Sequence, residues 1–293
     1  MIILRGKARA KINFFLNVEG KRPDGYHDIM TVMQQINLWD DVEIDVQKGN
    51  GIIISTDLPY LPVGIANIAY KAAKALQDRC NIDRMLKIKI RKGIPVSAGL
   101  AGGSSDAAAV LRLLDSGLSL GLPEETLMEE ALKIGADVPF CLMGKAALAE
   151  GVGERLTPIN GLEKGFILLS KPNIAVSTAK VYKALDLKEG VASRGILGAE
   201  AVIREMAAGN LDSLSDKLYN RLEDVTLIRH PIVGDIKSKM LQYGARGALM
   251  SGSGPTVFGI FKDYKRVSKA YKNLKKTYSQ TYITVAYSKE ENR

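Results

Sequence analysis

The sequence predicts an α+β protein of two lobes, and three observations support this fold class. Strand-like alternation and helical periodicity occur in both halves of the chain. They do not follow the regular strand–helix order of a doubly wound parallel sheet. The pattern restarts near residue 160, which predicts domains at 1–160 and 161–293. With 293 residues, 46% of them hydrophobic, each lobe is able to bury a core without disulfides.

The first half begins with a strand over residues 8–18. Ala10, Ile12 and Phe14 share one face of this strand, whereas Lys11 and Asn13 share the other. Considered alone, Lys11 would be a lysine on a strand surface. The other elements predicted in this half are a turn at 23–25, a hairpin of 42–46 with 51–55, a helix over 67–79, a strand over 85–91, and helices over 104–115 and 123–134.

The second half contains more helix than strand. Its predicted elements are a strand over 166–170, helices over 178–186, 196–207, 211–222 and 229–243, strands near 246–250 and 255–261, a basic helix within 262–276, and a last strand over 281–287.

Composition excludes several classes of protein. No run of about 18 apolar residues is present, so the sequence predicts no membrane span. The first 15 residues do not resemble a signal peptide, because charges interrupt their apolar stretch. Cys80 and Cys141 leave a disulfide open as an alternative, but a reduced pair is expected, which favours a cytoplasmic protein.

The net charge of +9 leaves open an anionic partner of some kind. Lysines are densest in residues 262–276, where Val267, Ala270, Tyr271 and Leu274 form the apolar stripe of an amphipathic helix. A solvated lysine face is the simpler interpretation. Nucleic-acid binding with a steep salt dependence is the alternative, but no aromatic residues alternate with the lysines as they would in a stacking platform.

The strongest functional signal is the glycine-rich stretch PVSAGLAGGSSDAAA at residues 95–109. Its glycines permit positive φ and a close approach to a ligand, and Ser104 and Ser105 are expected to cap the helix that follows. The free N–H groups at such a helix start bind phosphate. An ordinary capped helix is the alternative. The sequence contains no Walker A motif, no GxGxxG and no protein-kinase signature.

This stretch resembles the central motif of the GHMP kinases, together with ARAKINFFL at 8–16 and SGSGPT at 251–256. Longer matches cover nearly the whole chain: KINFFLNVEGKRPDGYHDI (11–29), IPVSAGLAGGSSDAA (94–108), GADVPF (135–140), EGVGE (150–154) and YNRLED (219–224). Ser97 and Ala101 depart from the family pattern, where glycine is common, and Met33 replaces an aromatic found in some relatives. The sequence suggests no role for YNRLED.

The resemblance implies a two-lobed GHMP-kinase fold with an N-terminal ATP-binding lobe and a ferredoxin-like C-terminal lobe. It also implies transfer of the γ-phosphoryl group of ATP, with Mg²⁺, to the 2-hydroxyl of a cytidine diphosphate derivative of methylerythritol in non-mevalonate isoprenoid synthesis. The expected partners are therefore small molecules and not nucleic acid or membrane, and the chain is expected to be a monomer or homodimer.

The same resemblance implies roles for individual residues. Lys11 would hold the attacking hydroxyl and Asp137 would accept its proton; taken alone, Asp137 would be a turn residue before Pro139. The ATP-binding residues implied are Pro95, Val96, Ser97, Ala98, Gly99, Leu100, Ala101, Gly102, Gly103, Ser104 and Ser105, with Asn67 and Lys92 near the adenine. The substrate-binding residues implied are Asn13, Tyr26, His27, Thr178, Tyr182, Gly252 and Ser253.

Two alternatives within this family remain. One is a homoserine or mevalonate type of kinase, against which the DGYH segment argues because such a substrate has no nucleobase. The other is a relative without activity that serves as a binding module, against which Lys11, Asp137 and the loop glycines argue.

Overall fold

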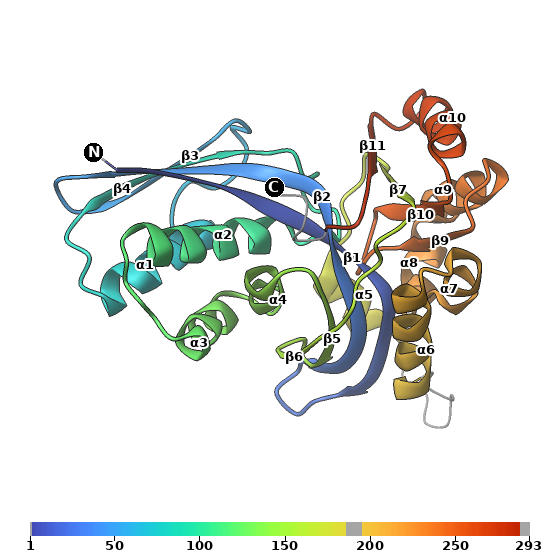
Figure 1. Ribbon diagram of the computed structural model, residues 1–293, viewed down its shortest axis with the longest axis horizontal. Helices are drawn as coiled ribbons and strands as arrows, with labels where there is room; N and C mark the ends of the chain where they lie inside the picture. The colour runs from blue at the N-terminus through green and yellow to red at the C-terminus, as the bar shows by residue number, and fades with distance from the viewer. Residues whose placement is uncertain (1, 186–194, 288–293) are drawn as a thin grey trace. The chain divides into compact units, whose positions relative to one another are not determined.

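The computed structural model describes residues 2–185 and 195–287 (Figure 1). The chain forms two compact units that alternate along the sequence. One contains residues up to 10, 38–94 and 101–144, and the other contains 11–37, 95–100 and the chain from 145 onward. The long strands β1 (Ile2–Lys21) and β2 (His27–Gln47) contribute one part to each unit. The predicted boundary near residue 160 stays a prediction.

The first unit is a sheet with helices on one face (Figure 1). Its strands are ordered β3-β4-β2-β1, and helices α1 and α2 pack against one another. Gly6 of β1 lies against Leu113 of α2, so the sheet and the helix approach closely. The elements of this unit, besides β1 and β2, are β3 (Gly51–Thr56), α1 (Ile68–Arg79), β4 (Met85–Arg91), α2 (Gly102–Gly117), α3 (Glu124–Ile134) and α4 (Val138–Met143).

The second unit contains a four-stranded antiparallel sheet. Its order is β11-β7-β10-β9, which is the strand order of a ferredoxin-like lobe, as the resemblance implied. Beside it, β5 pairs with β2 and with β6, and β8 pairs in parallel with β1. The elements are β5 (Ala146–Gly151), β6 (Arg155–Pro158), β7 (Phe166–Lys171), α5 (Thr178–Ala184), α6 (Gly195–Ala208), α7 (Leu211–Lys217), β8 (Tyr219–Asn220), α8 (Glu223–Arg229), α9 (Pro231–Gln242), β9 (Gly247–Met250), β10 (Val257–Phe261), α10 (Tyr264–Lys275) and β11 (Gln280–Thr284).

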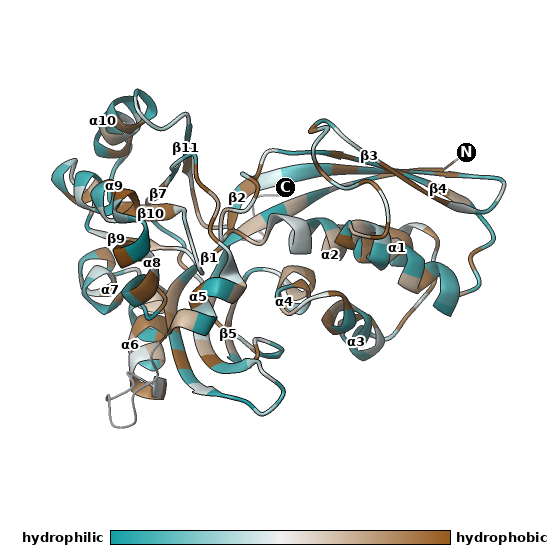
Figure 2. Ribbon diagram, turned by 180° about the vertical axis from the view of Figure 1, so that it is seen from behind, coloured by the Kyte–Doolittle hydropathy of each residue, from teal (hydrophilic) through white to brown (hydrophobic). Residues whose placement is uncertain are grey.

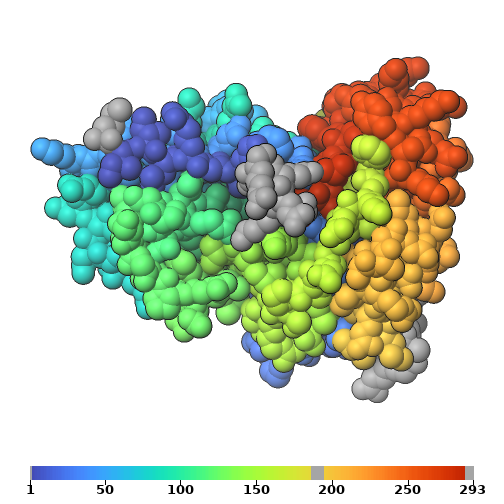
Figure 3. All heavy atoms as spheres, in the orientation of Figure 1, coloured from blue at the N-terminus to red at the C-terminus, as the bar shows by residue number. Residues whose placement is uncertain are grey.

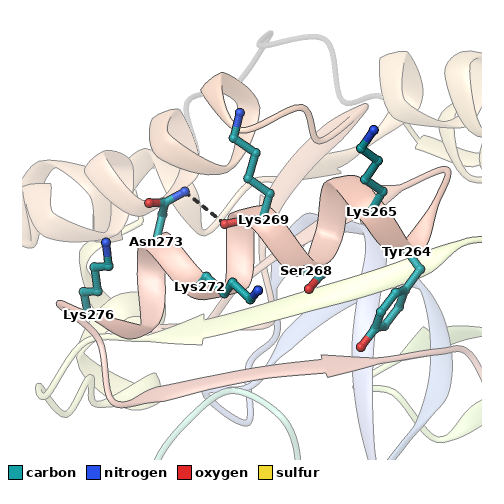
Figure 4. Close-up of a pocket in the computed structure, with 7 residues that line it drawn as sticks. All are labelled: Tyr264, Lys265, Ser268, Lys269, Lys272, Asn273 and Lys276. Carbon is teal, nitrogen blue, oxygen red and sulfur yellow. Dashed lines mark hydrogen bonds between the residues drawn. The ribbon is translucent and has the colours of Figure 1, made fainter.

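Helix α10 confirms the amphipathic pattern predicted from the sequence. Val267, Ala270 and Leu274 are buried in the core of the second unit, and the rest of the helix is largely hydrophilic (Figure 2). On the outer face a shallow hollow of about 570 Å³ is lined by lysines, with Tyr264 as its one aromatic residue (Figure 4). A base-stacking platform needs several aromatic rings, so this face does not resemble a nucleic-acid site.

The predicted hairpin of 42–46 with 51–55 is wrong, although both strands exist. β4 lies between them, pairing antiparallel with β2 and parallel with β3. The parallel pair β3 and β4 is connected through α1, because parallel strands need a long crossover. The short turn after residue 47 shows where β2 ends but does not determine its partner.

The helix predicted over 211–222 also ends earlier than expected. α7 stops at Lys217, and Tyr219 and Asn220 pair instead with Phe15 and Leu16 of β1. The helix predicted over 229–243 begins only at Pro231, since a proline disfavours helical geometry in the residue before it. Residues 27–41 of β2 were not predicted as strand, and α4, β5, β6, β8 and α8 were not predicted either. Among the described residues, no helix has the length and apolar character needed to cross a membrane.

Candidate active site

The glycine-rich loop has the backbone that its composition predicted. Ser97, Gly99 and Ala101 all have positive φ, at 51°, 73° and 57°. Two of these three are not glycine, so the departures at 97 and 101 keep the left-handed conformation and carry its strain, about 1–2 kcal/mol per residue. The loop therefore retains the path that glycine would give it.

The start of α2 differs from the prediction in a way that favours anion binding. Ser104 and Ser105 lie inside the first helical turn and are not caps; the capping position is Ala101, which makes no side-chain hydrogen bond. The helix begins at Gly102, two residues before Ser104, so both serines lie past the capping position. A 16-residue helix whose first N–H groups lack a side-chain cap offers donors and a positive dipole end to phosphate.

The two serines differ in what they contact. Ser105 Oγ donates to the carbonyl of Arg9 at 2.6 Å and lies 3.3 Å from Cys141 Sγ, so it fastens α2 to its surroundings. Ser104 is half-buried. Of the two hydroxyls, Ser104 is therefore better suited to contact a phosphate or its metal ion. Both cysteines are free thiols, as expected.

A buried ionic triad joins the two ends of the glycine-rich loop. Lys92 Nζ lies 2.5 Å from Asp40 Oδ2 and 2.6 Å from Asp106 Oδ2, and all three side chains are at most 7% exposed. Asp40 Oδ1 also accepts the N–H groups of Gly93 and Ile94, both at 2.7 Å. The triad thus ties the segment that enters the loop to Asp106, one turn into α2. Burial raises the pKa of the Asp106 carboxyl, an effect that Lys92 opposes.

Replacing Lys92 by methionine should lower the free energy of unfolding by about 3–5 kcal/mol, because two buried carboxylates would lose their cation. Urea denaturation measures this, with Lys74→Met as the control. Lys74 pairs with Asp78 on the exposed face of α1, so its loss should cost about 0.5 kcal/mol or less. Equal losses in the two variants would contradict the role of the triad.

The Lys92→Met deficit should also depend on pH. Without the cation, the folded pKa of Asp106 lies further above its unfolded value, so the folded state binds the proton more tightly. The stability supplied by protonating Asp106 is fully present below its unfolded pKa and is lost as the pH rises through the folded pKa. The deficit should therefore be largest at neutral pH and should shrink in acid.

Lys11 is a buried residue and not a surface lysine. Its side chain and that of Asn13 point the same way, as alternation predicted, and Lys11 Nζ donates to Asn13 Oδ1 at 3.0 Å. Asn13 Nδ2 donates to Thr31 Oγ1 at 2.8 Å, which in turn donates to the carbonyl of Phe15. The backbone N–H of Lys11 donates to the carbonyl of Leu100 at 3.1 Å. The backbone of Lys11 is therefore fastened to the glycine-rich loop, and its ammonium is held by Asn13.

The second glycine loop, at residues 251–256, lies against the first. Ser251 Oγ donates to the carbonyl of Gly99 at 2.9 Å. A Cβ atom at Gly99 would lie 2.2 Å from the carbonyl oxygen of Ser251, so only glycine fits there. A Cβ atom at Gly252 would lie 3.6 Å from Asn13 Oδ1. Within this unit the structure therefore brings together residues 95–100 of the glycine-rich loop, the second glycine loop, Lys11 and Asn13.

Four predicted substrate residues form two pairs in the second unit. The rings of His27 and Tyr182 lie 5.1 Å apart at an angle of 39°. Thr178 and Ser253 share a hydrogen bond of 2.7 Å between their hydroxyls. Burial lowers the pKa of His27, and nearby Lys21 lowers it further, so the imidazole is neutral at pH 7 and has one nitrogen to accept and one to donate. Tyr26, the residue before His27, is 64% exposed.

Asp137 occupies the capping position of α4, half-buried, and its side chain makes no cap hydrogen bond to that helix. Capping therefore does not explain its presence. Asn67 does act as a cap: its Oδ1 accepts the N–H of Ala69 at 2.9 Å, and its Nδ2 donates to the carbonyl of Pro62. The predicted adenine contacts of Asn67 and Lys92, whose ammonium faces two carboxylates, stay predictions.

Known proteins support the interpretation of this geometry. Two family models match the chain, "GHMP kinases N terminal domain" at residues 67–145 and "GHMP kinases C terminal" at residues 201–280 (Figure 3, cyan to green and orange to red). A protein of Alkaliphilus metalliredigens (strain QYMF), named 4-diphosphocytidyl-2-C-methyl-D-erythritol kinase, is 48% identical over 285 residues, or 97% of each chain. The chain belongs to the GHMP kinase family. Members of this family are ATP-dependent small-molecule kinases.

Other GHMP kinases match over nearly their full length. The protein of the same name from Alkaliphilus oremlandii (strain OhILAs) is 50% identical over 96% of each chain. A crystal structure of 4-(cytidine 5'-diphospho)-2C-methyl-D-erythritol kinase has a TM-score of 0.82 at 31% identity, covering 97% of this chain and all of that one. Homoserine kinase from Cytophaga hutchinsonii has a TM-score of 0.77 at 16% identity over 98% of this chain and 96% of its own, which shows a shared fold.

Proposed function

We propose that the chain transfers the γ-phosphoryl group of ATP to the 2-hydroxyl of 4-diphosphocytidyl-2-C-methyl-D-erythritol, giving the 2-phosphate and ADP. The observation that carries this proposal is the identity of 48–50% with relatives of that name over at least 96% of both chains. The structure supports it with an uncapped helix start at residue 102, suited to phosphate, and an aromatic pair suited to a nucleobase. The homoserine kinase match, at 16% identity, supports only the fold.

Lys11 and Asp137 are the proposed catalytic residues. The hydroxyl oxygen forms a bond to the γ-phosphorus while the bond from that phosphorus to the bridging oxygen breaks, and ADP leaves. The Lys11 ammonium, oriented by Asn13 at 3.0 Å, holds the hydroxyl and offsets the charge that develops on it. Asp137 takes the proton late, because a carboxylate is a weak base toward a free alcohol.

The glycine-rich loop from Pro95 to Ser105 is the proposed ATP site. Its backbone donors and the uncapped start of α2 fit a polyphosphate. Mg²⁺ is proposed to enter with ATP as part of the substrate, neutralising charge on the phosphates, and Ser104 is the hydroxyl proposed to contact it. We also propose a cytoplasmic location, in which the thiols of Cys80 and Cys141 stay reduced.

Removing the Tyr182 ring should raise the KM of the cytidine substrate, on the order of tenfold or more, because stacking on a nucleobase would be lost. The KM of ATP should stay the same. Steady-state kinetics of Tyr182→Ala measure both constants, with Tyr264→Ala as the control. Tyr264 also forms a ring pair, with Phe166 at 5.7 Å, but it is not a predicted substrate residue. An equal change in the KM of the cytidine substrate in the two variants would contradict the assignment of Tyr182 to the nucleobase.

The substrate itself is tested by measuring ADP release with three acceptors: the cytidine substrate, homoserine and mevalonate. The proposal predicts turnover with the first alone. Turnover of homoserine or mevalonate instead would keep the family and reject the substrate.

A further inference from the structure

The segment YNRLED at residues 219–224 matches the family but has no function assigned by the sequence. In the structure it starts with β8, which pairs with Phe15 and Leu16 of the strand that carries Lys11. It continues into α8, which begins at Glu223. The segment therefore lies next to the Lys11 strand, and two of its polar side chains bind the backbone at residues 250–252.

Asn220 is 3% exposed and uses its whole amide group. Its Nδ2 donates to the carbonyls of Met250 and Gly252, both at 2.8 Å, and its Oδ1 accepts the N–H of Leu222 at 3.0 Å. One side chain thus spans the end of β9 and the first glycine of the loop. No other side chain type of this size carries two donors and an acceptor in this arrangement.

Glu223 binds Met250, the residue that precedes the loop. Its Oε1 accepts the N–H of Met250 at 2.9 Å, and its Oε2 pairs with Lys237 Nζ at 2.6 Å. The two contacts of Glu223 are separable, since Lys237 touches only the far oxygen. Variants at 223 and 237 can therefore distinguish loop binding from the ion pair.

The loop that these residues hold contacts the candidate active site. Gly252 lies against Asn13 and against the carbonyl of Gly99, and Ser251 donates to that same carbonyl. Asn13 accepts from Lys11. A shift of residues 250–252 would consequently displace both the glycine-rich loop at Gly99 and the side chain of Lys11. All of these contacts lie inside one compact unit.

We propose that Asn220, with Glu223, is a positioning residue that fixes the 250–252 backbone and through it the ATP loop at Gly99 and the Lys11–Asn13 pair. This inference rests on the proposed function. Asn220 does not touch substrate in this account; it acts through the backbone it holds.

The test compares Asn220→Ala with Gln34→Ala. Gln34 is a matched control because it is also a buried amide in the same unit: its Nε2 donates to the carbonyls of Gln35, Lys145 and Tyr287, and its Oε1 accepts the N–H of Leu162. Both variants lose a comparable set of buried hydrogen bonds, so both should be less stable to urea. Only Asn220→Ala should lower kcat/KM for ATP, on the order of 10- to 100-fold, because Gly99 and the Lys11–Asn13 pair would be misplaced.

A second comparison keeps the test decisive if Asn220→Ala does not fold. Glu223→Ala should weaken the binding of a non-hydrolysable ATP analogue, measured by calorimetry, whereas Glu223→Gln and Lys237→Met should bind it as the wild type does. Unchanged kinetics in Asn220→Ala, or equal binding in Glu223→Ala and Lys237→Met, would overturn the inference. A wild-type protein that binds the analogue but does not phosphorylate the cytidine substrate would reject the proposed function instead.

Discussion

The Asp137→Asn variant should turn over about 10²- to 10⁴-fold more slowly than the wild type, which is the range for loss of a general base. The change keeps the size of the side chain and removes only its ability to take a proton. Urea denaturation of the variant, measured beside the kinetics, should show a folded protein, so that the loss of turnover reports on the proton transfer. Single-turnover kinetics with saturating ATP isolate the chemical step, and the KM values should change little.

Asp115→Asn is the control for this experiment. Asp115 Oδ1 accepts the N–H of Leu122 at 3.0 Å, a bond that an asparagine oxygen can also accept. The control should retain wild-type turnover. If Asp137→Asn also retained it, Asp137 would not be the base, and the proton would have to leave through solvent or phosphate.

Gly99→Ala should abolish ATP binding and destabilise the protein. Its methyl group would lie 2.2 Å from the carbonyl oxygen of Ser251 and 3.1 Å from the backbone of Gly254, so one of the two glycine loops would have to move. The positive φ of 73° adds about 1–2 kcal/mol of strain. The overlap and the strain both act on the backbone around Gly99. Because this backbone carries the proposed phosphate donors, ATP binding is lost together with stability.

Gly121→Ala separates steric overlap from backbone strain. Gly121 has a similar φ of 65°, but no atom lies within 4 Å of the position its methyl group would take. The Gly121→Ala protein should be destabilised only by the backbone strain, about 1–2 kcal/mol of unfolding free energy, and should bind the ATP analogue normally. A Gly99→Ala protein that binds the analogue as tightly as Gly121→Ala would show that the contact with Ser251 is not needed.

The sequence predicted those elements whose pattern is local. β1, α1, β4 and α10 follow from alternation or from a helical stripe, and the structure confirms them. It failed where the partner of a segment lies far away in the chain. β4 separates two strands that adjoin in sequence, and Tyr219 and Asn220 leave a helical pattern to pair with β1, some 200 residues earlier.

The same distinction applies to the candidate site. The glycine-rich loop and the Lys11–Asn13 face were predictable, because their composition and spacing are local. Asp40, Thr31 and Asn220 were missed, since each contributes through contacts with residues distant in sequence. Asp106 lies in the recognised motif, but only the fold reveals that it faces Lys92.

The most direct test of the whole account is ³¹P NMR of the protein incubated with ATP, Mg²⁺ and 4-diphosphocytidyl-2-C-methyl-D-erythritol. The account predicts a new phosphomonoester resonance that grows as the γ-phosphate signal of ATP declines, with the cytidine diphosphate signals retained. No such resonance with this substrate, but one with homoserine or mevalonate, would contradict the proposed substrate and the nucleobase roles of His27 and Tyr182.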